Sequence, residues 1–96
     1  MSSTPIPTVR ILILDDDETS RYLLGTVARM IGAEAAAVGT PAEALALVER
    51  QDFACALVDK NLVGADGLDF LDVLRRRQPN CSAVVVTAYG NLPSAV

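Results

Sequence analysis

Histidine is absent from this 96-residue chain, which contains only two cysteines, Cys55 and Cys81. A zinc site is therefore not expected, because structural zinc sites are built from four cysteine or histidine ligands. The two thiols lie in or beside apolar segments, and two cysteines so placed do not indicate a disulfide-stabilised framework. We interpret both as buried free thiols.

Long apolar runs are absent as well. No stretch approaches the roughly 20 apolar residues that span a bilayer. The segment Met1 to Thr8 has neither the basic start nor the apolar centre of a secretory signal. These absences predict a cytoplasmic protein that makes no contact with a membrane. Residues 1–8 are polar and carry prolines, so we expect them to form a flexible leader.

Positive charge is scarce, since 8 Lys and Arg residues stand against 12 Asp and Glu residues, a net charge of -4. The basic cluster Arg75-Arg76-Arg77 lies where we expect a helix to end, and cations there suit the helix dipole. Nucleic-acid binding through this segment is not expected, because phosphate contacts need a basic face. With 51% hydrophobic residues, the chain fits one small domain with an ordinary core.

Apolar periodicity divides the chain into alternating strands and helices, which predicts a parallel sheet covered by helices on both faces. The expected strands are residues 9–14, 34–38, 53–58 and 83–86. The expected helices are residues 17–31, 40–51 and 66–78, and Asn91 can cap one more that begins at Leu92. The apolar positions that define the first helix are Tyr22, Leu23, Val27, Met30 and Ile31, and those of the third are Leu68, Leu71 and Leu74.

Polar residues follow three of the expected strands, at the point where each strand ends. The carboxylates Asp15-Asp16-Asp17 follow the first strand, Asp59 follows the third, and Thr87-Ala88 follows the fourth. Because the carboxyl ends of parallel strands meet at one edge of the sheet, we expect these groups to converge. Like charges packed together cost energy unless a cation lies among them.

Around these residues the chain resembles the receiver domain of two-component response regulators. The resemblance depends on the acidic group after "ILIL", on "ALVDKNLVGADG" and on "VVVTA", in the family's order, and it covers residues 9–96. It implies an α/β, flavodoxin-like, doubly wound parallel sheet with the strand order 2-1-3-4, from which strand 5 is absent. The receiver domain would then be truncated at the start of helix 4.

The resemblance makes Asp59 the phosphoacceptor, which takes a phosphoryl group from a sensor histidine kinase or a phosphotransfer protein. It implies a Mg2+ ion, because a carboxylate that approaches an anionic phosphoryl group is otherwise repelled. Asp16, Asp59 and the backbone carbonyl of Asn61 would bind the ion, and Asp15 would act through water. Asp17 would instead belong to the start of the first helix.

Thr87 and Ala88 complete the set of residues that the resemblance implies. The Thr87 hydroxyl and the Ala88 amide would hold phosphoryl oxygens, and movement of Thr87 would report phosphorylation to the surface. The domain would be a signalling phosphoacceptor rather than an enzyme, although it would assist its own phosphotransfer and dephosphorylation. Gly64 and Gly67 are expected to shape the loop after Asp59 without contacting phosphate.

The chain departs from the family's pattern in two places. Val63 stands where the loop after the phosphoacceptor usually carries proline. The remainder of helix 4, a fifth strand with its pocket lysine, and helix 5 are also missing. Lys60 is the only lysine, and it should point away from the pocket because it directly follows Asp59. The strand at 83–86 would be an open apolar edge, so we expect a fragment or short form that self-associates there.

Two other hypotheses remain open. The segment "DDDET" is similar to the nucleophile motif of haloacid dehalogenase-type phosphatases, in which Asp15 would be the nucleophile and Asp17 the general acid. Against it, Glu18 replaces the usual glycine, the downstream lysine and acidic pair are absent, and Asp59 has no role. The third hypothesis is a receiver-like module that binds partners without being phosphorylated.

Overall fold

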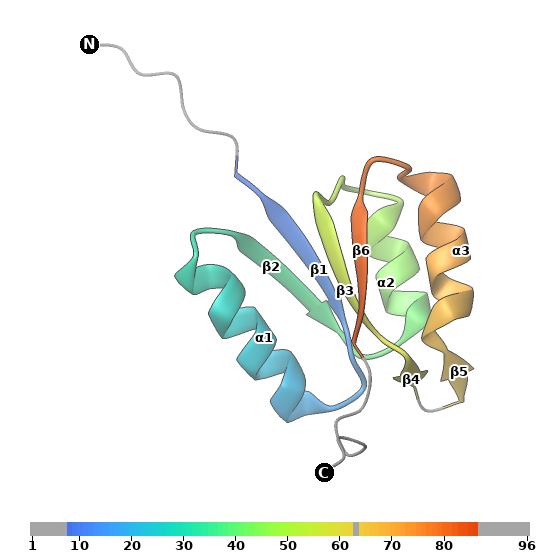
Figure 1. Ribbon diagram of the computed structural model, residues 1–96, viewed down its shortest axis with the longest axis horizontal. Coiled ribbons are helices and arrows are strands. Elements are labelled where there is room, and N and C mark those ends of the chain that lie inside the picture. The colour runs from blue at the N-terminus through green and yellow to red at the C-terminus, as the bar shows by residue number, and fades with distance from the viewer. Residues whose placement is uncertain (1–7, 63, 87–96) are drawn as a thin grey trace, which may run out of the picture.

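The computed structural model of the protein describes residues 8–62 and 64–86. A four-stranded parallel sheet forms the centre, with α1 on one face and α2 and α3 on the other (Figure 1). Its strands are β1 (Arg10–Leu14), β2 (Glu34–Val38), β3 (Cys55–Asp59) and β6 (Ser82–Val86), in the order β2-β1-β3-β6. The helices are α1 (Glu18–Met30), α2 (Pro41–Val48) and α3 (Gly67–Arg77).

This arrangement confirms the predicted flavodoxin-like fold and the strand order 2-1-3-4. The structure adds a short antiparallel pair, β4 (Asn61–Leu62) with β5 (Ala65–Asp66), which the sequence did not predict. Residues 1–7 of the predicted leader, and the helix expected from Leu92, lie outside the described part of the chain. No helix in the described ranges has the length and hydropathy needed to cross a bilayer.

The strand β1 lies at the centre of the fold because its side chains are apolar on both faces. Leu12, Ile13 and Leu14 are fully buried, and β1 pairs in parallel with β2 on one side and with β3 on the other. Such continuous apolar runs are typical of strands covered by helices on both sides. The strand therefore fixes where its carboxyl end, and the acidic residues after it, lie.

Each helix begins at a polar cap, as the sequence predicted. In all three, the side chain of the cap accepts a hydrogen bond from a backbone N–H of the first turn, which would otherwise lack a partner. The caps are Asp17 for α1, Thr40 for α2 and Asp66 for α3, with the N–H groups of Ser20, Glu43 and Leu68 as their donors.

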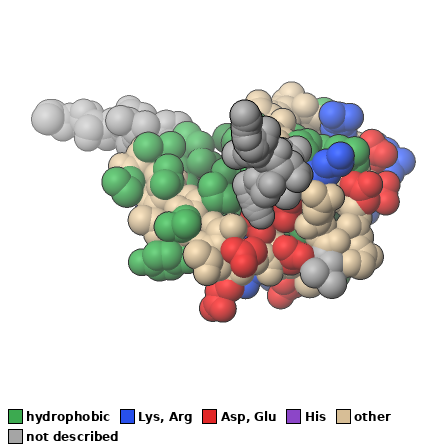
Figure 2. All heavy atoms as spheres, turned by 60° about the horizontal axis from the view of Figure 1, so that its bottom comes forward, with side chains coloured by type: hydrophobic (Ala, Val, Ile, Leu, Met, Phe, Trp, Pro, Cys, Tyr) green, Lys and Arg blue, Asp and Glu red, His purple; other side chains and the backbone are tan. Residues whose placement is uncertain are grey.

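The helix α1 is confirmed, but the large apolar residues that defined it in the sequence do not face the sheet; Leu24 is the large α1 residue that packs against the core. The buried residues of α1 are Gly25 and Ala28, small side chains that let the helix lie close to β1 and β2. Figure 2 shows hydrophobic side chains gathered on the side of the molecule that carries α1. The residues that define the first helix in the sequence are between 56% and 78% exposed: Tyr22, Leu23, Val27, Met30 and Ile31.

Two further expectations about burial are wrong in part. On α3, Leu71 and Leu74 are buried, but Leu68 is 44% exposed and Phe70 takes its place in the core. Cys55 and Cys81 are free thiols, yet they are half-buried rather than buried. Cys55 lies on the face of β3 toward α1, and α1 packs mainly over β1 and β2, so this part of the sheet is less covered within the described residues.

A buried glutamine that no sequence pattern indicated joins three segments. Gln78 ends α3, and its side-chain Oε1 accepts a hydrogen bond from the Phe53 N–H at 2.8 Å. Its Nε2 donates to the carbonyl oxygens of Val48, at 2.9 Å, and Gln51, at 2.8 Å. One side chain thus satisfies backbone groups at the end of α2 and in the segment between α2 and β3, which would be costly to bury without partners.

Replacing Gln78 should destabilise the fold more than its place at the end of a helix would suggest. The substitution Gln78→Ala leaves one N–H and two carbonyls without these partners, and we expect a loss of about 2–4 kcal/mol in the free energy of unfolding. Urea unfolding followed by circular dichroism measures this. The matched control is Gln51→Ala, since the network uses only its backbone; equal losses for the two variants would contradict the role assigned to the Gln78 side chain.

Candidate metal centre

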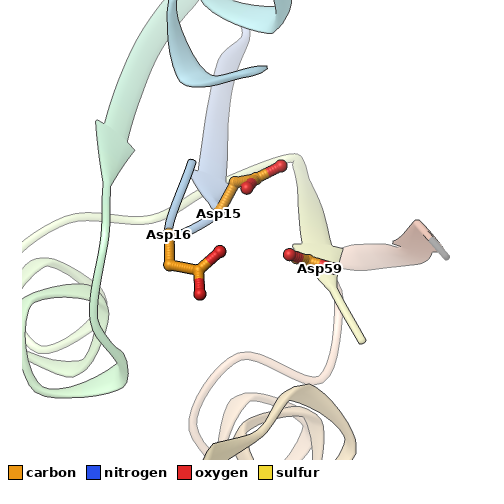
Figure 3. Close-up of side chains that lie close together, drawn as sticks. All are labelled: Asp15, Asp16 and Asp59. Atoms are coloured by element: carbon orange, nitrogen blue, oxygen red, sulfur yellow. The ribbon is translucent and has the colours of Figure 1, made fainter. Parts of the chain in front are cut away.

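Three carboxylates converge at the carboxyl edge of the sheet. Asp15 and Asp16 follow β1, and Asp59 ends β3, its direct neighbour. One carboxylate oxygen of each lies within 4.8 Å of the other two, and the side chains point toward a common centre (Figure 3). We refer to Asp15, Asp16 and Asp59 as the acidic cluster. Figure 2 shows acidic side chains on the face that this edge presents to solvent.

The backbone and side chain of Asp15 are held from three directions. Its N–H donates to the Val38 carbonyl at 3.1 Å, which extends the pairing of β1 with β2 by one residue. Its carboxylate Oδ1 accepts from the N–H of Asp17 at 2.9 Å. The Arg21 guanidinium reaches back from α1 and donates to the Asp15 carbonyl oxygen at 2.8 Å. The side chain of Asp15 is therefore oriented before any ligand binds.

The acidic cluster carries an electrostatic cost that falls on Asp15. Only 7% of this residue is exposed, and its burial raises the pKa of the carboxyl group above the ordinary value. The hydrogen bond from the Asp17 N–H opposes this shift, whereas the negative charges of Asp59, Asp16 and Asp17 add to it. A cation among these carboxylates would remove the repulsive part of the cost.

Asp17 does not join the acidic cluster. It is exposed and caps α1, with its Oδ2 accepting from the Ser20 N–H at 2.8 Å. Hydrogen bonds from the backbone and side chain of Ser20, together with the positive charge of Arg21, lower its pKa. The prediction that Asp17 belongs to the helix start is confirmed, and its engagement there argues against a role as general acid.

Asp59 is held by the segment that follows it. Its Oδ1 accepts from the Asn61 N–H at 3.1 Å, and the Lys60 N–H donates to the Val86 carbonyl of β6 at 2.9 Å. Lys60 is exposed, and no ion pair in the described ranges, 8–62 and 64–86, joins it to the acidic cluster. Metal binding by the Asn61 carbonyl stays a prediction. Gly64, with φ of 73°, forms the turn between β4 and β5.

The predicted phosphoryl-binding residues, Thr87 and Ala88, lie outside the described residues. The strand before them is placed as expected, because β6 ends at Val86, the parallel partner of Asp59. Their roles therefore stay predictions.

Arg21 is the neighbour of the site that the sequence analysis missed. Its guanidinium fits between Asp15 and Gly39, where a Cβ on Gly39 would lie 2.9 Å from Nη1. Nothing in the periodicity of α1 distinguishes this arginine, although its position four residues after Asp17 is a signal that could have been used. Because Gly39 has no side chain, the Arg21 guanidinium has room to contact the backbone beside the acidic cluster.

The donor set of the acidic cluster fits a hard divalent cation. Carboxylate oxygens are the ligands that Mg2+ prefers, and a few of them suffice because the ion keeps several waters. Soft metals prefer thiolate ligands, and neither cysteine lies in the cluster. Fold and site together define a doubly wound α/β domain with an acidic cluster beyond the carboxyl ends of its strands, where such folds bind their ligands.

Comparison with known proteins identifies the family. The family model of the response regulator receiver domain matches residues 11–96, so the chain belongs to this family. It is 36% identical over 86 residues to the photosynthetic apparatus regulatory protein RegA of Cereibacter sphaeroides. The aligned region covers 90% of this chain and 47% of that protein. The chain thus spans about half the length of this relative.

Solved structures of receiver domains agree with the fold. A receiver domain protein of Methanospirillum hungatei matches with a TM-score of 0.82 and 30% identity, over 90% of this chain and 69% of that one. A response regulator of Burkholderia pseudomallei, determined with a phosphorylated aspartic acid, a calcium ion and citrate, matches with a TM-score of 0.81 and 26% identity, over 88% of this chain and 49% of that one. The protein is therefore a receiver domain, a signalling domain of two-component systems.

The raised pKa of Asp15 predicts that its charge destabilises the fold when no divalent cation is present. A carboxyl group whose pKa is higher in the folded than in the unfolded state favours folding when protonated, and this contribution is lost as the pH rises through the folded pKa. We therefore expect Asp15→Asn, which keeps the Oδ1 acceptor, to raise the Tm at pH 7 in a chelator. The gain should shrink as the pH falls past the pKa of Asp15.

Asp17→Asn is the control, for which we expect a change in Tm of the opposite sign. The pKa of Asp17 is lowered, so its ionised form stabilises the fold above the unfolded pKa, and that contribution is lost as the pH falls through the folded pKa. This variant should lower the Tm slightly at pH 7. Thermal unfolding of both variants across pH measures the two effects, and a Tm decrease for Asp15→Asn at pH 7 would contradict the assigned cost.

Proposed function

We propose that Asp59 accepts a phosphoryl group from the phosphohistidine of a sensor kinase or phosphotransfer protein. A carboxylate oxygen of Asp59 attacks phosphorus, the phosphorus–nitrogen bond to the donor imidazole breaks, and an acyl phosphate forms. The observation that carries this proposal is the acidic cluster itself, which holds Asp59 within 4.8 Å of two other carboxylates at the carboxyl edge of the sheet. The relative from Burkholderia pseudomallei, with its phosphorylated aspartic acid and calcium ion, supports it.

Each residue of the proposed phosphorylation site has a separate role. Asp16, Asp59 and the carbonyl of Asn61 would bind Mg2+, and Asp15 would contribute through water. When bound, the ion neutralises the charge that builds up as a carboxylate approaches a phosphoryl group. The Asn61 N–H orients the Asp59 carboxylate, and the contacts to Asp15 keep the opposite wall of the site fixed. Thr87 and Ala88 would hold phosphoryl oxygens.

The other hypotheses gain less support. In a dehalogenase-type phosphatase Asp17 would be the general acid, but here it caps α1, and the family match is to receivers. In a receiver-like module that is never phosphorylated, the acidic cluster would bind an ion without Asp59 acting as an acceptor, and the relative with a phosphorylated aspartic acid favours phosphorylation. That the domain assists its own phosphotransfer and dephosphorylation is part of the proposal. Its cytoplasmic location also stays a prediction.

Incubation with Mg2+ and acetyl phosphate, followed by intact mass measurement and site mapping, tests the proposal. We expect one base-labile phosphate on Asp59. Asp59→Asn should abolish the adduct and spare part of the Mg2+ affinity. Asp16→Asn should weaken both, and for a lost metal ligand we expect a fall of about 10-fold or more in affinity. Calorimetric titration measures the affinity of each variant.

Two outcomes would reject phosphorylation of Asp59. Phosphate on Asp15 would favour the phosphatase. Mg2+ binding without any modification, by acetyl phosphate or by a phosphorylated histidine kinase, would favour the partner-binding module. The Asp17→Asn variant serves as the control, because the proposal gives its carboxylate no contact with the ion or the phosphoryl group.

We further propose that the chain on its own associates through β6. Within residues 8–62 and 64–86, β6 pairs with a strand on one side only, and its sequence Ser-Ala-Val-Val-Val carries no charge or proline to discourage another strand. The opposite edge strand, β2, carries Glu34, which pairs with Arg10 at 3.3 Å. A second copy that pairs along β6 would continue the sheet.

Size-exclusion chromatography with light scattering tests this association. We expect the mass to rise with protein concentration, and Val84→Lys to shift the equilibrium toward the monomer, because it places a charge on the edge strand. The matched control is Val9→Lys, since Val9 and Val84 are both 49% exposed but Val9 precedes β1. A thermally stable monomer at every concentration would contradict the proposal.

A further inference from the structure

The first residue of α3 rests directly on the backbone of the proposed phosphoacceptor. Gly67 is buried, and a Cβ built on it would overlap the carbonyl oxygen of Asp59. The same Cβ would lie 3.0 Å from the Asp59 carbonyl carbon and 3.1 Å from the Cα of Lys60. These are backbone atoms, so no side-chain rotation can make room for a methyl group.

Glycine is required at position 67 because there is no space for a side chain, and not because the backbone there has a positive φ. Among the described residues, the glycines with positive φ are Gly32 and Gly64, whereas Gly67 begins a helix. Alanine forms helices more readily than glycine does. The helix itself therefore gives no reason for glycine at this position, and what glycine allows is the close approach of α3 to Asp59.

We propose that Gly67 is a positioning residue for Asp59. The Gly67 N–H donates to the Lys60 carbonyl at 3.0 Å, while the Lys60 N–H donates to Val86 of β6 at 2.9 Å. Lys60, the residue directly after Asp59, is thus held between β6 and the start of α3. This contact holds the Asp59 carboxylate within the acidic cluster. The inference rests on the proposed function, since it assigns Gly67 to the same site.

The variant Gly67→Ala tests the contact in the full chain. The methyl group must push Asp59 away from α3, so we expect the Mg2+ affinity of the folded protein to fall by about 10- to 100-fold, as when other supports of metal ligands are removed. The Mg2+ concentration for half-maximal phosphorylation by acetyl phosphate should rise in parallel. Calorimetry gives the affinity, and circular dichroism gives the folded fraction to which it is normalised.

Two control variants separate positioning from general stability. Gly25→Ala adds a methyl group to the other buried helical glycine, where the nearest atoms, at 3.4 Å, belong to the flexible Arg29 side chain. Gln78→Ala destabilises the other end of α3. Both should retain the Mg2+ affinity of the wild type in their folded fraction. An equal fall in affinity for Gln78→Ala would show that lost stability alone is responsible and would overturn the proposal.

The remaining outcomes are also decisive. Wild-type affinity in folded Gly67→Ala would overturn the role of Gly67 while leaving the proposed function intact. Failure of the wild type to bind Mg2+ and to become phosphorylated would instead reject the proposed function. If Gly67→Ala does not fold even in a stabilising osmolyte, the contact is a requirement of folding and the positioning role is wrong.

Discussion

The parallel pairing of β1 with β3 is the constraint on which the rest of the structure depends. Because Leu14 lies opposite Val58, the residues that follow the two strands emerge side by side at one edge of the sheet. Segments more than forty positions apart in the sequence thereby bring Asp15 and Asp59 together. Helices on both faces are needed to cover such apolar strands, so the same pairing sets the layers of the fold.

The acidic cluster costs folding stability, and its preset geometry would favour the binding of a cation. Burial and repulsion raise the pKa of Asp15, and the fold tolerates this because hydrogen bonds to the backbone orient the carboxylate in advance. Binding energy is then not spent on ordering the ligands. Arg21 and Gly67 act in a similar way. Arg21 contacts the backbone of Asp15 and Gly67 that of Asp59, and neither contacts the carboxylate.

Strand ends, helix caps and hydrophobic runs are local features, and these were predictable from the sequence. The strand order also predicted that Asp15, Asp16 and Asp59 converge, but individual contacts between distant residues were not predictable. The side-chain network of Gln78, the reach of Arg21 and the overlap that forces glycine at 67 join residues with no shared periodicity. The exposed apolar face of α1 was missed for a different reason: helical spacing shows that residues such as Val27 share a face, but not which way that face points.

The Gln78 network and the acidic cluster lie at opposite ends of the strands. The network joins Val48, Gln51 and Phe53 before β3 begins, at the edge opposite the acidic cluster. One end of the sheet is therefore joined by the hydrogen bonds of a neutral side chain, and the other holds the acidic cluster. The Gln78 network contacts no residue of the acidic cluster, so replacement of Asp15, Asp16 or Asp59 leaves its hydrogen bonds in place.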